Sequence, residues 1–290
     1  MALTHNTTVS AAAAPPARRE ASLATRLWVL VYGVVAYALG VTALVAWILM
    51  MLGVVPFTGG PTGLLTSGRA LALDLGLLVA FGLQHSVMAR PAWKSRWLRV
   101  VGPALERPTY MLATGAVLLL ALWLWQPMSA VIWSLEQPTA TAAAYAVALA
   151  AWAYLFVATF AIDHFELFGL RQVWSYFRGR PMTPVQFRVR WMYRFDRHPI
   201  MIGALLGMWV TPSMTLGHLV FAIGFSLYVV VGVYFEEPAL VAHWGARYED
   251  YRDRVGSIVP RLSRDQARLR HGRDAGLLRG ATHEAHHAPD

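Results

Sequence analysis

The chain has 290 residues, of which 57% are hydrophobic and only 14% are charged, and its formal net charge is +9. Soluble domains carry about 25% charged residues, so the composition argues against an ordinary soluble enzyme. The sequence contains no cysteine, which excludes disulfides, thiolate metal sites, iron–sulfur clusters and a cysteine nucleophile.

Apolar runs follow one another along the chain, at residues 27–52, 70–88, 110–125, 140–162 and 199–235. A helix needs about 20 apolar residues to cross the hydrocarbon core of a bilayer. The last run is interrupted near Thr211-Pro212-Ser213, so it predicts a hairpin of two helices, the first of them short. We therefore expect an all-α, polytopic membrane bundle with five to six transmembrane helices.

Lysine and arginine are concentrated in every second connection between these runs. They lie before the first run, after the second, after the fourth and after the last, whereas residues 126–139 contain none. An excess of Lys and Arg marks the cytoplasmic side. Both termini are therefore predicted to be cytoplasmic, with the protein in a bacterial-type inner membrane. The basic stretches lack the aromatic platform of a nucleic-acid binder, so we expect a lipid bilayer as partner and no nucleic acid.

Three segments flank or connect the membrane runs. Residues 1–26 are predicted to be a disordered cytoplasmic arm, 27–262 the membrane domain, and 263–290 a polar, disordered tail. Within residues 163–198, apolar side chains at helical spacing predict an amphipathic helix at the membrane interface: Leu167, Leu170, Trp174 and Phe177. Residues 283–287 match the H-E-x-x-H zinc pattern in the tail, but no third ligand follows, so no metal site is expected.

Ionisable residues inside membrane runs are costly and therefore candidates for function. Asp74 is interpreted as part of a polar seam between helices, whereas for His85 a structural and a catalytic role both stay open. His164, Phe168 and Arg171 follow i, i+4, i+7 spacing where the fourth run ends. This face could present an imidazole and a guanidinium to one pocket, or it could anchor the chain at the interface.

Charged residues also lie at both ends of the last hairpin. Arg197 and His198 precede it, and Glu236 and Glu237 follow its return helix, so the four side chains should meet. Pro199 suits the first position of a helix, whose free N–H groups would form an anion site beside the two carboxylates. A ligand with an ammonium and a carboxylate would match this arrangement. The alternative is an Arg–Glu salt bridge that only closes the hairpin.

This hairpin, together with Gly203 and Tyr248-x-x-Tyr251, resembles the signature of the isoprenylcysteine carboxyl methyltransferase superfamily. Within it, residues 84–91, 106–110, 164–172 and 211–218 are similar to those of the membrane methyltransferases that act on methanethiol. The resemblance implies S-adenosyl-L-methionine as cofactor. The residues that it implies for cofactor binding are Arg197, His198, Pro199, Gly203, Glu236, Glu237, Tyr248 and Tyr251.

The resemblance further implies that a small thiol, methanethiol, is methylated to dimethyl sulfide. Because the thiolate is the nucleophile, the enzyme needs a group that removes the thiol proton. His85 or His164 would accept this proton and Arg171 would stabilise the thiolate, while Tyr110 and Gln172 are expected to contact the substrate.

The sequence is also compatible with other functions. The same cofactor could serve a prenylcysteine or another lipid-like carboxylate. His85 and His164 could instead be axial ligands of a haem. A nicotinamide-dependent reductase is also conceivable because a fold does not fix the chemistry, and so is a transporter in which the charged hairpin ends form only salt bridges. The oligomeric state is left open.

Overall fold

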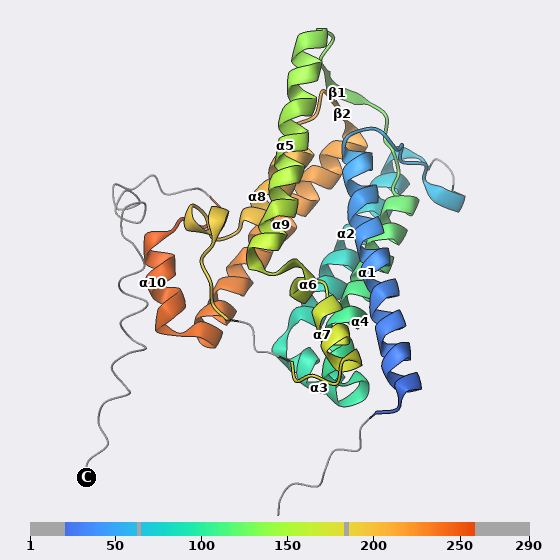
Figure 1. Cartoon of the computed structure of the whole chain (residues 1–290). Coiled ribbons are helices and arrows are strands. Elements are labelled where there is room, and N and C mark those ends of the chain that lie inside the picture. The colour runs from blue at the N-terminus through green and yellow to red at the C-terminus, as the bar shows by residue number, and fades with distance from the viewer. Residues whose placement is uncertain (1–20, 63–64, 183–185, 259–290) are drawn as a thin grey trace, which may run out of the picture.

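The computed structural model describes residues 21–62, 65–182 and 186–258 (Figure 1). Its long helices are α1 (Leu23–Met51), α2 (Ser67–Ala89), α4 (Pro103–Leu124), α5 (Pro138–Ile162) and α9 (Leu216–Trp244). Its shorter helices are α3 (Pro91–Val101), α6 (His164–Leu167), α7 (Leu170–Phe177), α8 (Pro199–Trp209) and α10 (Ala246–Arg254), with 3-10 turns η1 (Gly60–Thr62) and η2 (Trp191–Arg194). Two strands, β1 (Val131–Ser134) and β2 (Ser213–Thr215), complete the described elements.

The predicted terminal segments are only partly covered by the structure. Helix α1 begins at Leu23, with the Ser22 side chain accepting a hydrogen bond from the Thr25 N–H, so it starts inside the predicted arm 1–26. The first 20 residues and the predicted tail 263–290, with its H-E-x-x-H match, lie outside the described residues.

The five long helices are each long and apolar enough to cross a membrane. They expose many large apolar side chains outward, among them Val79 and Leu83 on α2 and Leu227 and Val230 on α9. The protein is therefore an integral membrane protein with an all-α bundle, as predicted. Helix α8 has 11 residues and is about 16 Å long, too short for a hydrocarbon core of about 30 Å.

The chain nevertheless runs from one end of the bundle to the other in the region of α8. Helix α8 begins beside α5, where the Tyr154 hydroxyl donates to Asp196 Oδ2 at 2.7 Å. Strand β2, which follows α8, pairs antiparallel with β1 in the connection that precedes α5. Helix α8 is thus the short first helix of the predicted hairpin, and an extended segment continues it. The strand pair was not predicted.

The helices form two groups, one of α1, α2 and α4 with the short α3 and α7, and one of α5, α8 and α9 (Figure 1). Glycines allow close backbone contact within each group. A Cβ on Gly115 of α4 would lie 2.9 Å from the Cα of Gly40 on α1, and one on Gly203 of α8 would lie 2.8 Å from the Ala151 carbonyl oxygen on α5. Gly203 therefore allows α8 to pack against α5, and its assignment to the cofactor site stays a prediction.

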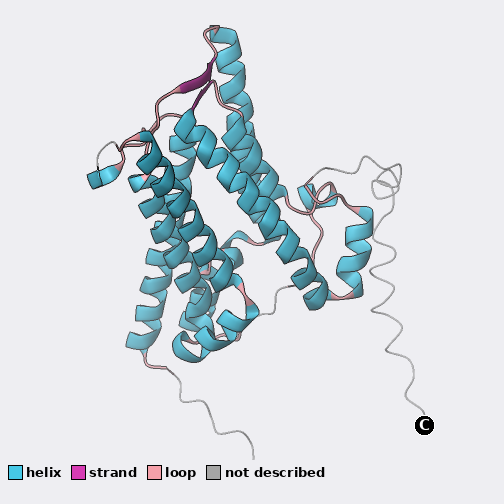
Figure 2. Ribbon diagram, turned by 180° about the vertical axis from the view of Figure 1, so that it is seen from behind, coloured by secondary structure: helices cyan, strands magenta, loops and turns pink. Residues whose placement is uncertain are grey.

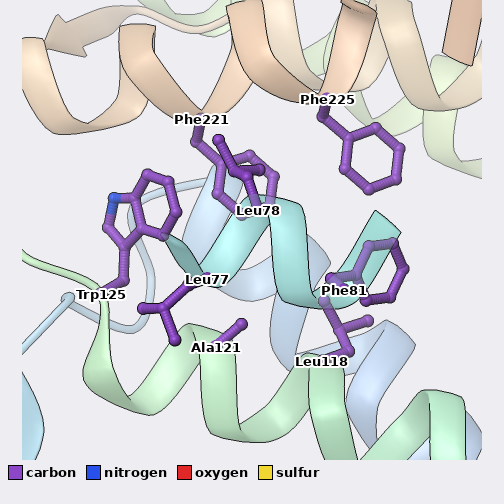
Figure 3. Close-up of a pocket in the computed structure, with 8 residues that line it drawn as sticks. All are labelled: Leu77, Leu78, Phe81, Leu118, Ala121, Trp125, Phe221 and Phe225. Atoms are coloured by element: carbon purple, nitrogen blue, oxygen red, sulfur yellow. The ribbon is translucent and has the colours of Figure 1, made fainter. Parts of the chain in front are cut away.

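The two groups pack together near the strands and separate toward the other end of the bundle (Figure 2). Trp47 lies at their junction, with its ring centroid 5.1 Å from that of Trp152 and 4.6 Å from that of Phe225. A cavity of about 10 Å³ remains there, enough for about one water molecule (Figure 3). Its lining is apolar and comes from α2, α4, the residue after α4, and α9: Leu77, Leu78, Phe81, Leu118, Ala121, Trp125, Phe221 and Phe225. A charged ligand therefore has no place at this junction.

Asp74 lies near the same end as the strands and is fully buried. Its Oδ1 accepts a hydrogen bond from the Gln126 backbone N–H at 2.9 Å, which joins α2 to the segment after α4. This contact agrees with the predicted polar seam between helices.

The amphipathic helix predicted between residues 163 and 198 is shorter than its sequence pattern indicates. Gly169, in the left-handed conformation with φ 88°, separates α6 from α7. Val173 of α7 is fully buried against Gly33 of α1, whereas Trp174 is half exposed. A second amphipathic helix, α3, lies in the basic connection after α2 and was not predicted.

Candidate active site

The charged hairpin ends meet as predicted, and Arg197 lies at their centre. Its Nε donates to Glu237 Oε1 at 3.0 Å, and its Nη1 donates to the carbonyl oxygens of Arg252, at 3.0 Å, and Val255. The Arg197 backbone N–H donates to the Gly256 carbonyl oxygen at 2.9 Å. Only 6% of the Arg197 side chain is exposed. The guanidinium thus joins the start of α8, the end of α9 and the segment after α10, which is the geometry of the salt-bridge alternative.

The two adjacent glutamates have different surroundings. Glu237 Oε1 accepts hydrogen bonds from Arg197 and from Ser257 Oγ at 3.1 Å, and lies 3.1 Å from His198 Nε2. Glu236, by contrast, is 44% exposed, and its Oε2 is 3.8 Å from His198 Nδ1. Adjacent helical residues point about 100° apart, so only one of the two carboxylates can face inward. Glu236 is the carboxylate accessible to a ligand.

Tyr248 and Tyr251 are packed inside the C-terminal segment and are not available to stack on an adenine. They are 3% and 7% exposed, and their rings contact the ring of Phe187 with centroid distances of 6.2 and 5.6 Å. The Tyr251 hydroxyl donates to the Tyr193 carbonyl oxygen at 2.7 Å. Burial raises the pKa of Tyr248 to about 12, so its hydroxyl stays protonated. This burial argues against the predicted contact of the two rings with the cofactor, which stays a prediction.

The start of α8 is a weaker anion site than predicted. Pro199 is the first helical residue, as expected. The N–H groups of Met201 and Ile202 both donate to the His198 carbonyl oxygen at 3.0 Å. The Ile202 bond is the ordinary first hydrogen bond of the helix, whereas the Met201 bond uses one of the N–H groups that the prediction had reserved for a ligand.

His85 and Tyr110 form a pair beside the gap between the two helix groups. The Tyr110 hydroxyl is 2.8 Å from His85 Nε2, and Thr114 Oγ1 is 3.4 Å from His85 Nδ1. The imidazole is stacked on Phe81 and lies 6.1 Å from the ring of Tyr228 on α9. Both members of the pair are half-buried, so they remain within reach of a small ligand.

The pair lies beside α9, the helix that carries the exposed carboxylate of Glu236. The His85 ring is 6.1 Å from the ring of Tyr228, which precedes Glu236 by about two helical turns. Two cations lie at the same end of the bundle: the Arg107 guanidinium is 5.9 Å from the ring centre of Tyr110, and that of Arg90 is 4.7 Å from the ring centre of Phe235. An acid, a histidine–tyrosine pair and two cations thus share this end of the bundle.

His164 is, in contrast, a fully satisfied core histidine that is 4% exposed. The Thr159 hydroxyl donates to the Phe156 carbonyl oxygen, so it must accept from His164 Nδ1–H, 2.8 Å away. His164 Nε2 then accepts from the Tyr37 hydroxyl at 2.9 Å. Burial lowers the pKa of His164 and keeps it neutral. Neither nitrogen is free for a thiol proton or a haem iron, so the structure opposes both proposed roles.

Arg171 and Gln172 belong to a separate polar cluster. Arg171 pairs with Asp163 at 2.5 Å and lies 3.8 Å from Glu166, while Gln172 Nε2 donates to Glu166 Oε1 at 2.9 Å. Burial raises the pKa of Glu166. Because Gly169 breaks the helix, Arg171 does not share a face with His164, and its charge is already opposed by Asp163. These contacts argue against Arg171 as the group that stabilises a thiolate.

The chain is similar in sequence to several bacterial enzymes. It is 47% identical over 193 residues to a methanethiol S-methyltransferase of Mycobacterium tuberculosis (67% of this chain, 79% of the relative). It is 42% identical over 244 residues to methanethiol S-methyltransferase 2 of Bradyrhizobium diazoefficiens (82% and 92%). A methanethiol S-methyltransferase of Crocosphaera subtropica is 38% identical over 247 residues (82% and 94%). The chain belongs to the methanethiol S-methyltransferase family. No family model and no solved structure match it.

In this methanethiol S-methyltransferase family member, the predicted site residues divide into packed and accessible ones. The packed residues are His164, Gln172, Arg197, His198, Pro199, Gly203, Tyr248 and Tyr251. The partly or fully accessible ones are His85, Tyr110, Arg171, Glu236 and Glu237. Tyr228, Arg90 and Asp196 were not among the predicted site residues. Arg90 lies in the 84–91 motif and Asp196 directly precedes the Arg-His-Pro motif, whereas nothing in the sequence singled out Tyr228.

We predict that replacing Glu237 destabilises the protein strongly, whereas replacing Glu236 has almost no effect on its stability. Glu237→Gln removes the charge that balances buried Arg197, and loss of one partner of a buried ion pair should lower the free energy of unfolding by about 3 kcal/mol. Glu236→Gln should change it by less than about 0.5 kcal/mol, as expected of an exposed side chain. Thermal unfolding of both variants in detergent measures the difference. Equal midpoints would contradict the assignment of Glu237 to the fold.

Proposed function

We propose that this chain is a membrane enzyme that transfers a methyl group from S-adenosyl-L-methionine to methanethiol and releases dimethyl sulfide. Membership of the methanethiol S-methyltransferase family, with more than nine tenths of two relatives covered, supports the reaction. The observation that carries the proposal is the His85–Tyr110 pair, whose Nε2 and hydroxyl are 2.8 Å apart and which lies beside Tyr228 of α9, the helix that carries the exposed Glu236.

The accessible charges fit the methionine end of the cofactor. S-adenosylmethionine carries an ammonium, a carboxylate and a positively charged sulfur, and when bound it supplies an electrophilic methyl group. Glu236 would attract the positive groups, and Arg90, exposed above Phe235, would pair with the carboxylate. Arg197, His198 and Glu237 would hold Glu236 in place rather than bind the ligand themselves. In this proposal Arg197, His198 and Glu237 have a positioning role, instead of the direct contacts with the cofactor that the sequence predicted.

His85 is the base in this proposal. A cysteine thiol has a pKa of about 8.5, and a simple alkyl thiol a higher one, so a neutral thiol must lose its proton before attack. His85 takes that proton, and Tyr110 holds the imidazole through its hydroxyl. The thiolate would then attack the methyl group that S-adenosylmethionine supplies when bound, using its own electron pair for the new bond. The electrons of the broken carbon–sulfur bond would stay with the donor sulfur, leaving two neutral sulfides.

The gap between the helix groups favours this encounter of opposite charges. Apolar side chains, among them Phe81 and Phe225, close the gap on the side of the strands. The attraction between a thiolate and a positively charged sulfur is stronger where water is excluded. A small lipophilic thiol also partitions into the surroundings of an exposed apolar helix surface.

The proposed reaction can be tested directly on purified protein in detergent. Given methanethiol and S-adenosylmethionine, the wild type should release dimethyl sulfide, detected by headspace gas chromatography. Glu236→Gln should weaken S-adenosylmethionine binding, measured by calorimetry, by about tenfold or more, because one charge-assisted contact contributes about 1.5–3 kcal/mol. Methylation of a prenylcysteine analogue without any dimethyl sulfide would favour the lipid-like carboxylate instead.

The role of His85 predicts a pH signature. His85→Ala should lower kcat at pH 7 by about 10²- to 10⁴-fold, the usual contribution of a general base, with little effect on S-adenosylmethionine affinity. Raising the pH toward 9 should restore part of the rate, because more thiolate then forms without help. His164→Gln is the comparison, and its effect should not diminish as the pH rises. An equal pH response of both variants would remove His85 from the role of base.

We also propose that both termini and the segment 163–198 face the cytoplasm of a bacterial-type inner membrane. The alternating basic connections support this orientation, and α1 begins at the end of the bundle where α9 ends (Figure 1). A cysteine introduced at Gln137, at the start of α5, should react with an impermeant reagent added outside intact cells. A cysteine introduced at Gly179 should react only after the membrane is opened. The wild type is the control, since it has no cysteine.

A further inference from the structure

One face of α9 runs from the aromatic junction to the candidate active site. Phe221, Phe225, Tyr228, Gly232 and Glu236 follow one another at intervals of three or four residues, which places them on one side of the helix. Val229 and Val233, on the adjoining face, are buried in the core. Val230 and Tyr234 are exposed on the outer side of the helix. The face that carries Gly232 is therefore the one directed at α2.

Contacts between this face and α2 follow one another toward the open end and then stop. Near the strands, a Cβ on Gly224 would lie 2.3 Å from Leu78, and the rings of Phe225 and Phe81 are 5.9 Å apart. Farther along, a Cβ on Gly82 of α2 would lie 3.2 Å from the Tyr228 ring. The ring of His85 lies 6.1 Å from the ring of Tyr228 and is the last of these contacts between α2 and α9.

Gly232 lies one helical turn beyond this last contact. A Cβ built on Gly232 meets no atom within 4 Å among the described residues, although the residue is only partly exposed. The open space thus lies between His85 and Tyr228 on one side and Glu236 on the other. These are the groups that the proposed function assigns to the thiol and to the methyl donor.

We infer that the space beside Gly232 is the chamber in which the thiol meets the methyl group, and that Gly232 determines the size of the acceptor. The inference rests on the proposed function and adds the location of the transfer. A hydrogen atom in place of a side chain leaves room for a thiol between the base and the carboxylate. Any larger residue here would project into the path of the attacking sulfur.

The test compares Gly232→Ala and Gly232→Val with the wild type. Both variants should fold, because the added atoms meet no neighbour and alanine and valine are better helix formers than glycine. The kcat/KM for methanethiol should fall about tenfold in Gly232→Ala and at least 100-fold in Gly232→Val, since one methylene group in a close-fitting site changes kcat/KM by about 10- to 200-fold. The dissociation constant of S-adenosylmethionine should stay within threefold.

A matched control is Gly76 of α2, where a Cβ also meets nothing within 4 Å among the described residues. Gly76 is exposed and is placed, by helical spacing, on the side of α2 opposite Leu78. Gly76→Ala and Gly76→Val should leave kcat/KM unchanged, which separates a steric effect from general stiffening of a membrane helix.

The outcomes distinguish the inference from the proposed function. A Gly232→Val variant that retains wild-type kcat/KM overturns the chamber. A parallel loss of S-adenosylmethionine affinity also overturns it, because the space would then belong to the methyl donor and not to the acceptor. A variant that fails to fold contradicts the open space itself, and Gly232→Ala tests this with the smaller side chain. If the wild type makes no dimethyl sulfide, the proposed function fails before the variants are compared.

Discussion

The buried ion pair between Arg197 and Glu237 is the interaction on which the C-terminal half of the molecule depends. A guanidinium that is 6% exposed is stable only if a charge and hydrogen-bond acceptors surround it, and here Glu237 and the carbonyl oxygens of Arg252 and Val255 provide them. These partners come from the end of α9 and from the end of α10. The pair therefore fixes where α8 starts and where the chain returns after α10.

The same pair also determines which glutamate a ligand can reach. Because Glu237 points inward to Arg197, helical geometry turns Glu236 toward the opening between α2 and α9. The Arg-His-Pro and Glu-Glu motifs therefore act mainly as a frame that positions one carboxylate. Tyr248 and Tyr251 extend this frame, since their rings fill the space under α10.

His164 and His85 have the same side chain, but their surroundings give the first a structural role and leave the second available for chemistry. His164 has both nitrogens bound to hydroxyl groups inside the protein, so it holds α1 and α5 together around a neutral imidazole. Both nitrogens of His85 also lie next to hydroxyl groups, those of Tyr110 and Thr114, but the Thr114 contact is long at 3.4 Å and His85 borders the region where α2 and α9 cease to touch. The close contacts through Gly82 and Gly224 bring these helices together just above this opening.

Much of the architecture was determined by the sequence itself. Five apolar runs of sufficient length require membrane helices, and a hairpin requires Arg197 to approach Glu236 and Glu237, because helix length fixes where a chain returns. The spacing of residues does not say what covers a helix face, so these contacts depend on the tertiary structure. In it, Glu237 and not Glu236 pairs with Arg197. Tyr248, Tyr251 and His164 are buried, and Gly203 packs against α5. It also added a strand after α8 that pairs with β1, since an extended segment needs hydrogen-bond partners that only a distant part of the chain can supply.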